Sequence, residues 1–352
     1  MKSLSVFTLM ATVALQAQTV TFNQPTYVCH RIPHPIAIDG IISEDEWGKV
    51  RSLGEFKDIY ENGPKPALRT MTKMAYDDEG LYIAAHLEEP HLWATLDAHD
   101  APLYQENAFE FFIDPSNSTH NYLEYEVNAM GTEWDLFLSK PYRDAPMIAI
   151  SNWEFMGMKS KVHLSGTLNN PTDRDEYWSV EIFIPWNSIY QVTNVRKRKP
   201  AAGDRMRMNF QRVEWDLSVR DGKYVKAVAS GTERPQPHYW LWASQGNTGT
   251  SHAPEYWGYV QFAGTVAGVA DTPFIPDPDD TVRHYLRNLY YRQKEYYRTN
   301  KTYARSLNEL KVGENIPVGI ADMKIHNTPS FYEITCTYKN KVWHLSQDGL
   351  IW

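Results

Sequence analysis

The sequence predicts an antiparallel β-sandwich that is followed by a small α+β domain at the C-terminal end. Short segments of alternating apolar and polar residues, separated by Gly, Pro, Asn and Asp, run from about residue 21 to residue 262. Aromatic residues make up 13% of the 352 residues, which is typical of β-rich folds. The pattern changes after a proline-rich stretch, where a single helical period begins.

Hairpins account for much of the predicted sandwich. Two short runs of turn residues each separate a pair of alternating segments, as in β-hairpins. These runs are Asp77-Asp-Glu-Gly80 and Pro115-Ser-Asn-Ser-Thr-His120. No long helical period interrupts this series. The predicted strands are residues 70–76, 81–87, 108–114, 121–127, 178–184 and 205–210.

The domain boundaries follow from changes in composition. The proline-rich stretch is expected to be a stiff linker. In the domain after it, apolar and tyrosine residues fall at helical spacing between Val282 and Tyr297, and two strands follow near the C-terminal end. No function can be read from this last domain. The predicted segments are a signal peptide (1–17), the sandwich (18–265), the linker (266–280) and the α+β domain (281–352).

The first residues predict export to the periplasm or the extracellular space. Lys2 precedes a short apolar run from Leu4 to Leu15, and Ala17 offers a cleavage point, as in secretory signal peptides. No segment is long and apolar enough to predict a transmembrane span. The net charge of −8 disfavours nucleic acid or an anionic membrane as a partner. The chain has two cysteines, Cys29 and Cys336, and the sequence does not decide whether they form a disulfide.

A set of motifs follows in a fixed order along the sandwich. The first is an apolar strand that runs into Asp39-Gly40 and then into a short acidic turn closed by Trp47. The others are Asp77–Ile83, Glu106–Asp114, Tyr177–Trp186, Gly203–Phe210 and His252–Phe262. In this order they resemble the carbohydrate-binding modules of family 9 and their relatives, over about residues 34–262. The resemblance implies a β-sandwich that binds a saccharide and supports polysaccharide catabolism, and it leaves the C-terminal domain uncovered.

The resemblance also implies where a sugar would bind. In the best-understood members two tryptophan rings sandwich one terminal sugar, and polar side chains bind its hydroxyls. The first tryptophan corresponds to Tyr104 and the second falls near Ser251. An arginine that contacts the sugar corresponds to Glu126. The sugar clamp is therefore changed in kind, and the specificity of those members is not transferred.

Strand alternation predicts one polar sheet face. Glu110 lies on the opposite face from Phe109 and Phe111, and the alternating polar residues of 122–128 and 205–211 each share a face. Rigidly held carboxylates, guanidinium groups and amides suit sugar hydroxyls, whereas the alternative is a solvated face with ion pairs. The candidate ligand-binding residues are Tyr104, Glu110, Glu124, Glu126, Arg207, Asn209, His252 and Trp257. Further candidates for an aromatic platform are Trp134, Trp153, Trp240 and Trp242.

Calcium is the usual structural ion of the resembled family, which directs attention to acidic turns. Carboxylate oxygens are the hard ligands that Ca²⁺ prefers, although none of these turns has the spacing of an EF-hand. The alternative is an acidic turn without metal. The candidate calcium ligands are Asp39, Glu44, Asp45, Asp77 and Asp78.

Two other function classes remain open beside saccharide binding. Paired carboxylates such as Glu110 with Glu124 could perform glycoside hydrolysis, but Arg207 is expected to lower their pKa values, which disfavours a protonated acid. Related DOMON-type sandwiches bind haem through Met and His, and the candidates for that role are Met130, Met206, Met208 and His163 or His252. Protein partners cannot be predicted from the sequence.

Overall fold

The computed structural model describes residues 20–144, 146, 149–193, 199–312, 316–328 and 330–352. The predicted signal peptide, residues 1–17, lies outside the described residues. The chain divides into two compact units, one of Phe22–Pro278 with Asp348–Trp352 and one of Asp279–Gln347 with Val20 and Thr21. No helix among the described residues is long and apolar enough to cross a membrane.

The larger unit is a β-sandwich, which confirms the predicted fold class. Its strands are β1 (Thr26–Arg31), β2 (Lys57–Asp58), β3 (Thr70–Tyr76), β4 (Gly80–Glu88), β5 (Ala108–Asp114), β6 (Tyr122–Asn128), β7 (Glu133–Leu138), β8 (Ala149–Ile150), β9 (Lys159–Ser165), β10 (Tyr177–Pro185), β11 (Arg205–Trp215), β12 (Leu217–Arg220), β13 (Lys223–Lys226), β14 (Pro237–Leu241) and β15 (Gly258–Val266). Its helices are α1 (Asp45–Lys49), α2 (Trp186–Tyr190) and the 3₁₀ turns η1 (Leu103–Gln105) and η2 (Pro254–Tyr256).

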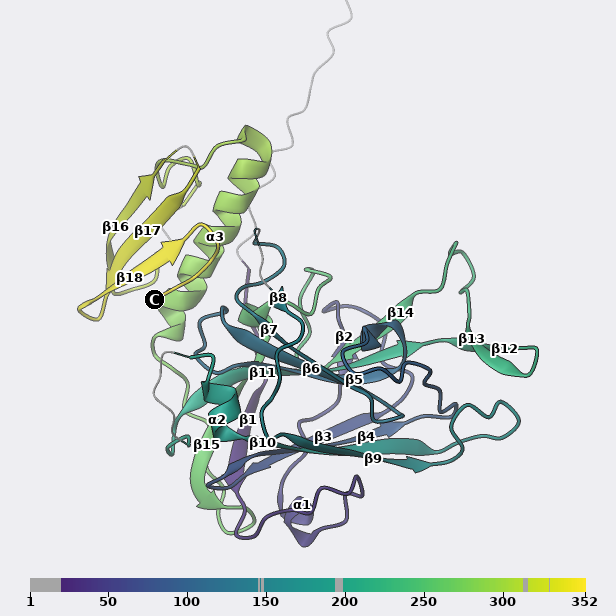
Figure 1. Ribbon diagram of the computed structural model, residues 1–352. Coiled ribbons are helices and arrows are strands. Elements are labelled where there is room, and N and C mark those ends of the chain that lie inside the picture. Colours follow the sequence, from purple (N-terminus) through teal and green to yellow (C-terminus); the bar gives the residue numbers. More distant parts are fainter. Residues whose placement is uncertain (1–19, 145, 147–148, 194–198, 313–315, 329) are drawn as a thin grey trace, which may run out of the picture. The chain divides into compact units, whose positions relative to one another are not determined.

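Two layers are joined through strand β1. Within the described residues, hydrogen bonds run in the order β8-β7-β6-β5-β11-β15-β1-β3-β4-β10-β9, with β14 and β2 added beside β11. Most neighbours are antiparallel, but β1 is parallel to both β15 and β3. Strands β5, β6, β7, β11 and β14 form one layer and β3, β4, β9 and β10 the other (Figure 1).

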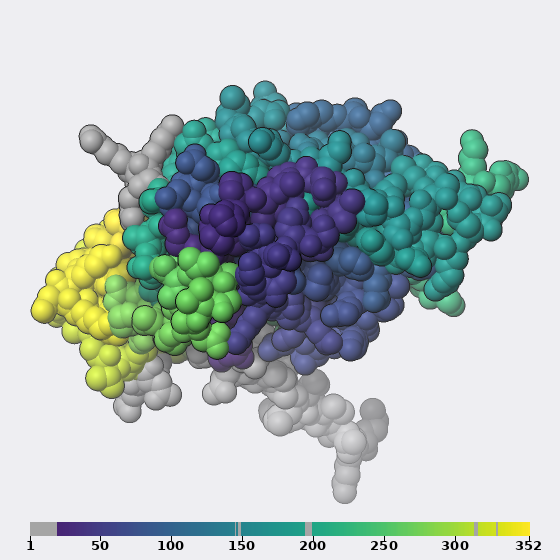
Figure 2. Space-filling model, turned by 90° about the horizontal axis from the view of Figure 1, so that it is seen from below, coloured from purple at the N-terminus to yellow at the C-terminus, as the bar shows by residue number. Residues whose placement is uncertain are grey.

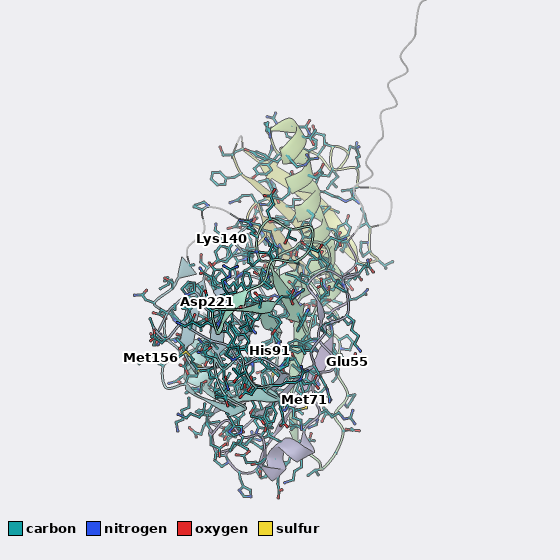
Figure 3. All side chains as sticks on the ribbon, turned by 90° about the vertical axis from the view of Figure 1, so that its right-hand side faces the viewer. Glu55, Met71, His91, Lys140, Met156 and Asp221 are labelled. Carbon is teal, nitrogen blue, oxygen red and sulfur yellow. The ribbon has the colours of Figure 1, made fainter. Side chains whose placement is uncertain are left out.

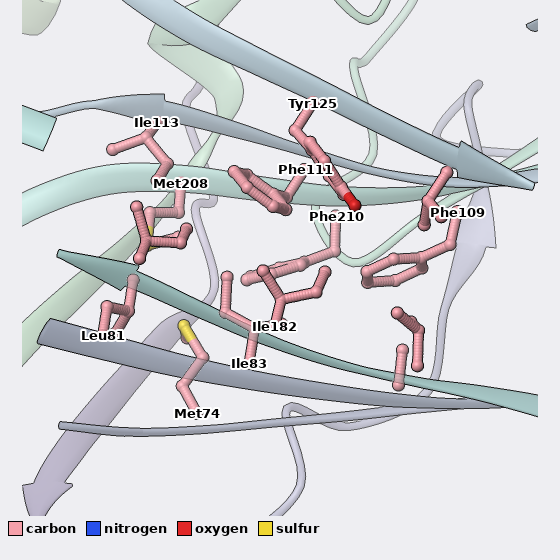
Figure 4. Close-up of a cluster of buried hydrophobic side chains, with 14 of the residues drawn as sticks. Met74, Leu81, Ile83, Phe109, Phe111, Ile113, Tyr125, Ile182, Met208 and Phe210 are labelled. Carbon is pink, nitrogen blue, oxygen red and sulfur yellow. The ribbon is translucent and has the colours of Figure 1, made fainter. Parts of the chain in front are cut away.

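The core lies between these layers and is built from alternate residues of each strand. Phe109, Phe111 and Ile113 of β5 and Met208 and Phe210 of β11 face the second layer (Figure 4). From that layer Met74, Leu81, Ile83 and Ile182 point back toward them (Figure 4). The predicted alternation is therefore confirmed. Since Met206 and Met208 are core residues, their role is packing.

The Asp39–Trp47 motif stabilises the outer face of the second layer. Glu181 of β10 accepts hydrogen bonds from the backbone N–H groups of Asp39 (3.1 Å) and Gly40 (3.0 Å) and from Nε1 of Trp47 (2.7 Å). Trp47 packs with Tyr82 in a small cluster on this face. The N-terminal part of the unit, in purple, forms part of the surface on this side (Figure 2). The motif is thus a structural clamp.

Gly40 is required by this clamp. Its φ of +89° lies in the left-handed region, and a Cβ atom built on it would lie 2.8 Å from the backbone N of His163. The turn therefore approaches β9 too closely for any side chain.

The proline-rich segment before residue 279 is attached to the sandwich. Gln261 of β15 donates from Nε2 to the carbonyl of Pro273 (2.9 Å) and accepts from the N–H of Ile275 (2.8 Å). Arg205 donates to the carbonyl of Ile275 (2.8 Å) and forms an ion pair with Asp277 (3.1 Å). This part of the predicted linker is held against β11 and β15 and is not a free spacer.

The smaller unit is an α+β fold, as predicted. Helix α3 (Asp280–Asn300) is followed by an antiparallel sheet of β16 (Ile320–Asn327), β17 (Tyr332–Tyr338) and β18 (Lys341–Ser346). The sequence does not predict strand β16, because its apolar residues do not alternate strictly with polar ones; the strand has a register shift between Ala321 and Lys324 and no fully buried residue. Cys29 in the larger unit and Cys336 in the smaller are buried free thiols.

Candidate functional site

A cavity of about 420 Å³ lies over the polar face of β5, β6 and β11. Loop residues line its sides, including the turn at Tyr104 and the segment from Gly249 to His252. Its lining residues are Ile59, Tyr104, Glu110, Phe112, Glu124, Glu126, Trp134, Tyr142, Gln211, Tyr239, Gly249, Thr250, Ser251 and His252. Five of the eight predicted ligand-binding residues therefore meet in one place, namely Tyr104, Glu110, Glu124, Glu126 and His252.

Strand register brings Glu110 to the floor of this cavity. Glu110 of β5 is directly opposite Glu126 of β6 and Gln211 of β11. Its Oε2 accepts a hydrogen bond of 2.5 Å from Nε2 of Gln211, whereas its buried Oε1 has no hydrogen-bond partner among the described residues. Burial raises the pKa of Glu110 to about 8, and the bond from Gln211 only partly offsets this effect.

Glu124 and Glu126 share the floor with Glu110. The carboxylates of these glutamates each offer an oxygen within 4.8 Å of the others. Oε2 of Glu126 accepts the backbone N–H of Tyr104 at 2.8 Å. Burial raises the pKa values of Glu124 and Glu126, and the charges of neighbouring glutamates raise them further. The floor therefore gathers three carboxyl groups in a poorly solvated place, where burial favours their protonated forms.

His252 forms one wall and is neutral. Its Nδ1 lies 3.0 Å from the hydroxyl of Tyr122, and its Nε2 lies 3.8 Å from Oε1 of Glu124. Burial lowers the pKa of His252 to about 3. A proton on Nε2 would satisfy both contacts, since Tyr122 then donates to Nδ1 and the ring N–H faces Glu124.

Aromatic rings form the mouth of the cavity. The rings of Tyr104 and Trp134 lie 6.2 Å apart at an angle of 34°. Tyr104 is 42% exposed and Tyr142 is 45% exposed, and the ring of Tyr142 meets His252 edge-on at 4.4 Å. Tyr239 of β14 is a further lining residue. Accessible rings beside fixed carboxylates suit a ligand with one apolar face and several polar groups.

The prediction that Trp257 is an exposed platform is wrong. Its side chain is fully buried and packs against Phe112 and Tyr122 at ring distances of 5.3 and 5.2 Å. Its Nε1 donates to the carbonyl of Ser251 at 2.9 Å. Trp257 thus supports the cavity wall from behind and cannot stack on a ligand.

Arg207 and Asn209 also lie outside the cavity lining. Arg207 is opposite Asp114 in the strand register, and its guanidinium donates to the hydroxyl of Tyr259 at 2.9 Å. The prediction that it lowers the pKa values of the glutamates is wrong, because it acts on Asp114 instead. Asn209 is buried, and its amide bonds with the backbone N–H (2.9 Å) and carbonyl (3.0 Å) of Ala243.

Other aromatic side chains had different outcomes. Trp240 and Trp242 are buried in the sandwich core, so they offer no platform. Trp134 lines the cavity. Sequence reasoning missed Tyr142 and Tyr239, which lie in segments without a motif and reach the cavity only through the fold. Strand alternation places Gln211 on the correct strand face, but no motif marks it as a ligand-binding residue.

The predicted calcium ligands separate into two places. Asp39 and Glu44 lie with Glu181, and each offers an oxygen within 4.8 Å of the others. Among the described residues, Asp45, Asp77 and Asp78 belong to no such group. The carboxylate of Asp77 accepts the N–H groups of its own turn, and Asp78 is paired with Arg31 and Lys199. The carboxylate oxygens of Asp39, Glu44 and Glu181 are the type of ligand that Ca²⁺ prefers.

A second buried charge cluster lies on the other face of β11, at Arg212, the residue after Gln211. Arg212 donates to Glu89 (3.0 Å) and to Glu214 (2.8 Å), and its guanidinium lies over the ring of Trp240 at 5.4 Å. Asn107 donates to both carboxylates. Nη1 of Arg212 has no hydrogen-bond partner among the described residues, but its other donors are paired with both carboxylates, so we assign the cluster a structural role.

Two further cavities lack a comparable cluster of groups. One of about 830 Å³ lies between β1 and the proline-rich segment, where Lys49 and Arg51 are its charged lining residues beside Asp271. Another, of about 430 Å³, includes Glu55 and Met71 in its lining (Figure 3). Neither combines buried carboxylates with accessible rings. The cavity over Glu110 is therefore the candidate site.

The sequence matches the carbohydrate family 9 binding domain-like family over residues 38–250, which is more than half of the chain. The chain belongs to this family. The match covers the strands that carry Glu110, Glu124 and Gln211 and thus the floor of the cavity. It confirms the resemblance that the ordered motifs indicate. No curated relative matches the sequence.

The matches among solved structures include three at low sequence identity. A Bacteroides uniformis protein has a TM-score of 0.49 and 14% identity, over 68% of this chain and 99% of that chain. A carbohydrate binding module of family 9 from Caldicellulosiruptor kristjanssonii, in complex with cellotriose, has a TM-score of 0.43 and 20% identity, over 71% and 100%. The same kind of module in complex with glucose has a TM-score of 0.42 and 20% identity, over 70% and 100%.

Proposed function

We propose that this family 9 domain binds a saccharide in the cavity over Glu110. The observation that carries the proposal is the convergence of fixed carboxylates with accessible rings in one cavity of about 420 Å³. The C–H groups of a pyranose can pack on Tyr104 and Trp134, while Glu110 and Glu126 accept hydrogen bonds from its hydroxyls. Membership of the family supports the same conclusion.

The cellular role that we propose is binding of a polysaccharide or its chain end outside the cytoplasm, in support of polysaccharide catabolism. Support for export comes from the apolar run between Leu4 and Leu15, which follows Lys2. We also propose Asp39 and Glu44, with Glu181, as the ligands of a structural calcium ion. This group lies at the Asp39–Trp47 motif, so the ion would stabilise the fold.

Calorimetric titration with a panel of mono- and oligosaccharides tests the proposal. Saccharide binding that Tyr104→Ala weakens would support the cavity as the site. Pairs of a reducing sugar and its alditol show whether a chain end is bound. If no sugar in the panel binds, saccharide binding is contradicted. If Tyr104→Ala leaves the affinity for a bound sugar unchanged, the site lies elsewhere.

One observation favours glycoside hydrolysis as a second candidate. The pKa of Glu110 is raised to about 8, which keeps that carboxyl protonated at neutral pH, as a general acid must be. However, burial raises the pKa values of Glu124 and Glu126 as well, so no neighbouring carboxylate is favoured as the ionised nucleophile. Release of reducing ends from an oligosaccharide, lost in Glu110→Gln, would establish the enzyme.

A further inference from the structure

The cavity floor holds an unusual arrangement of like charges. Glu110 and Glu126 are directly opposite each other on neighbouring strands, where like charges destabilise a sheet. Glu124 lies on the same face, and all these side chains are at most 4% exposed. A purely structural sheet face would not be expected to retain three buried carboxyl groups together.

No positive charge balances these carboxyl groups within the described lining of the cavity. That lining contains no lysine or arginine, and its single histidine, His252, is neutral because burial lowers its pKa to about 3. Arg143 follows Tyr142 in the chain, but its guanidinium forms ion pairs with Glu255 (2.9 Å) and Asp144 (3.5 Å). The missing countercharge must therefore come from a bound molecule or from protons.

The hydrogen bonds of the floor leave acceptors for such a molecule. Gln211 binds Oε2 of Glu110, and the backbone of Tyr104 binds Oε2 of Glu126. Oε1 of Glu110 is buried without a partner among the described residues. A buried carboxylate oxygen that lacks a donor calls for a donor from the ligand.

The rings at the mouth favour an organic cation. Tyr104, Trp134, Tyr142 and Tyr239 line the cavity together. The face of an aromatic ring attracts a positively charged group, most strongly where water is excluded. The same rings can pack against the C–H face of a pyranose, so a positive charge and a sugar ring suit the same cavity.

We propose that the ligand of this cavity is an amino sugar, whose ammonium group is bound by Glu110, Glu124 and Glu126. This inference rests on the proposed saccharide binding and specifies its ligand class. An ammonium group has three N–H donors and no acceptor, which matches a floor of acceptors. Charge-assisted hydrogen bonds of this kind are also about twice as strong as neutral ones.

A divalent metal ion is the competing occupant, and the lining favours it less. Ca²⁺ takes six to eight oxygen ligands. Beyond the glutamates, the carbonyl oxygen of Gln211 and the hydroxyl oxygen of Thr250 already accept hydrogen bonds, from the hydroxyl of Ser251 and from the N–H of His252. The rest of the lining consists mainly of rings, which are not ligands for such an ion.

Calorimetric titration of the full chain with matched sugars tests the inference. The probes are the glucosamine disaccharide, its N-acetylated form and cellobiose, which carry an ammonium, an amide and a hydroxyl at the same ring position. Since a hydrogen bond to a charged group contributes about 1.5–3 kcal/mol, we expect the glucosamine disaccharide to bind at least about tenfold more tightly than the other two. Each titration is repeated with a calcium chelator.

The variants Glu110→Gln and Glu126→Gln keep the shape of the floor and remove charge. In both we expect the preference for the glucosamine disaccharide over cellobiose to disappear. Glu233→Gln is the matched control, because Glu233 is exposed and outside the cavity lining. Thermal unfolding of each variant confirms that it is folded, and the comparison of sugars on the unsubstituted protein remains decisive if a variant is not.

The outcomes separate the inference from the proposed function. Equal or tighter binding of cellobiose would overturn the amino-sugar inference and leave saccharide binding intact. If none of the tested sugars binds, both the amino-sugar inference and the proposed saccharide binding are contradicted. If both the chelator and Glu110→Gln abolish sugar binding, the carboxylates bind a metal ion and not an ammonium group. This result would overturn the inference.

Discussion

Gln211 donates a hydrogen bond of 2.5 Å from Nε2 to Oε2 of Glu110, while its carbonyl oxygen accepts the hydroxyl proton of Ser251. The amide is held in one orientation, because a carboxylate is an acceptor and the hydroxyl supplies a donor. This relay connects the loop at the cavity wall to the floor. It fixes one oxygen of Glu110 and leaves the other for a ligand.

Glu110 should make folding stability depend on pH. Its pKa is raised to about 8 in the folded state, above about 4.3 for a free glutamate in the unfolded chain. The folded state therefore holds the proton more tightly, so this group's contribution to stability is full below about pH 4.3 and falls as pH rises through about 8. Denaturant unfolding at pH 5 and pH 8.5 measures it.

Glu110→Gln isolates that contribution. We expect the variant to unfold at a similar free energy to the unsubstituted protein at pH 5, where Glu110 is protonated in the folded state. At pH 8.5 we expect it to be more stable by about 1–2 kcal/mol, because an amide needs no counterion. The same loss of stability with pH in both proteins would contradict the raised pKa.

Tyr104→Ala should weaken saccharide binding by about fivefold to tenfold. Loss of one ring contact costs about 1 kcal/mol, and Tyr104 is accessible at the mouth of the cavity. Tyr104→Phe keeps the ring and should retain most of the affinity. Titration calorimetry with a bound sugar measures both variants, and equal losses would show that the hydroxyl, not the ring face, binds.

Trp257→Ala should act on stability, in contrast to Tyr104→Ala. Trp257 is fully buried against Phe112 and Tyr122, so removal of its ring leaves a cavity and costs about 3–5 kcal/mol. Thermal unfolding measures the loss. If Trp257→Ala leaves stability unchanged but weakens sugar binding, Trp257 stacks on the sugar after all.

Gly40→Ala should destabilise the sandwich more than Gly203→Ala does. Both glycines have positive φ, +89° and +88°, so both substitutions carry backbone strain of about 1–2 kcal/mol. A Cβ at position 40 also meets the backbone of β9 at 2.8 Å, whereas a Cβ at position 203 meets nothing within 4 Å. We expect an additional loss of about 1–3 kcal/mol for Gly40→Ala in denaturant unfolding. Equal losses of stability in the two variants would show that the backbone of β9 moves to make room for the added Cβ.

Calcium should raise the unfolding temperature if Asp39 and Glu44 bind it. At a calcium concentration 100 times the Kd, binding to the folded state alone contributes about 2.7 kcal/mol. Asp39→Asn should remove the calcium-dependent shift, and Asp78→Asn is the control because Asp78 is paired with Lys199 and Arg31. An unfolding temperature that does not change with calcium or chelator would contradict this site.

The sequence by itself determined the sandwich, two of its hairpins and the buried face of its central strands. Alternation has a period of two, so Phe111 and Met208 could be assigned to the core and Glu110 to the polar face. The ordered motifs identified the family, because they mark turns and contacts such as Asp39-Gly40 with Glu181. These features are local, or they depend on the order of segments alone.

Only the tertiary structure decided which polar residues meet. Alternation does not give the offset between strands, and that offset places Gln211, not Arg207, opposite Glu110. The path of the loops then buries Trp257 and brings Tyr142 to the cavity, although neither position can be read from a periodic pattern. The site depends on contacts between distant segments, which carry no local signal in the chain.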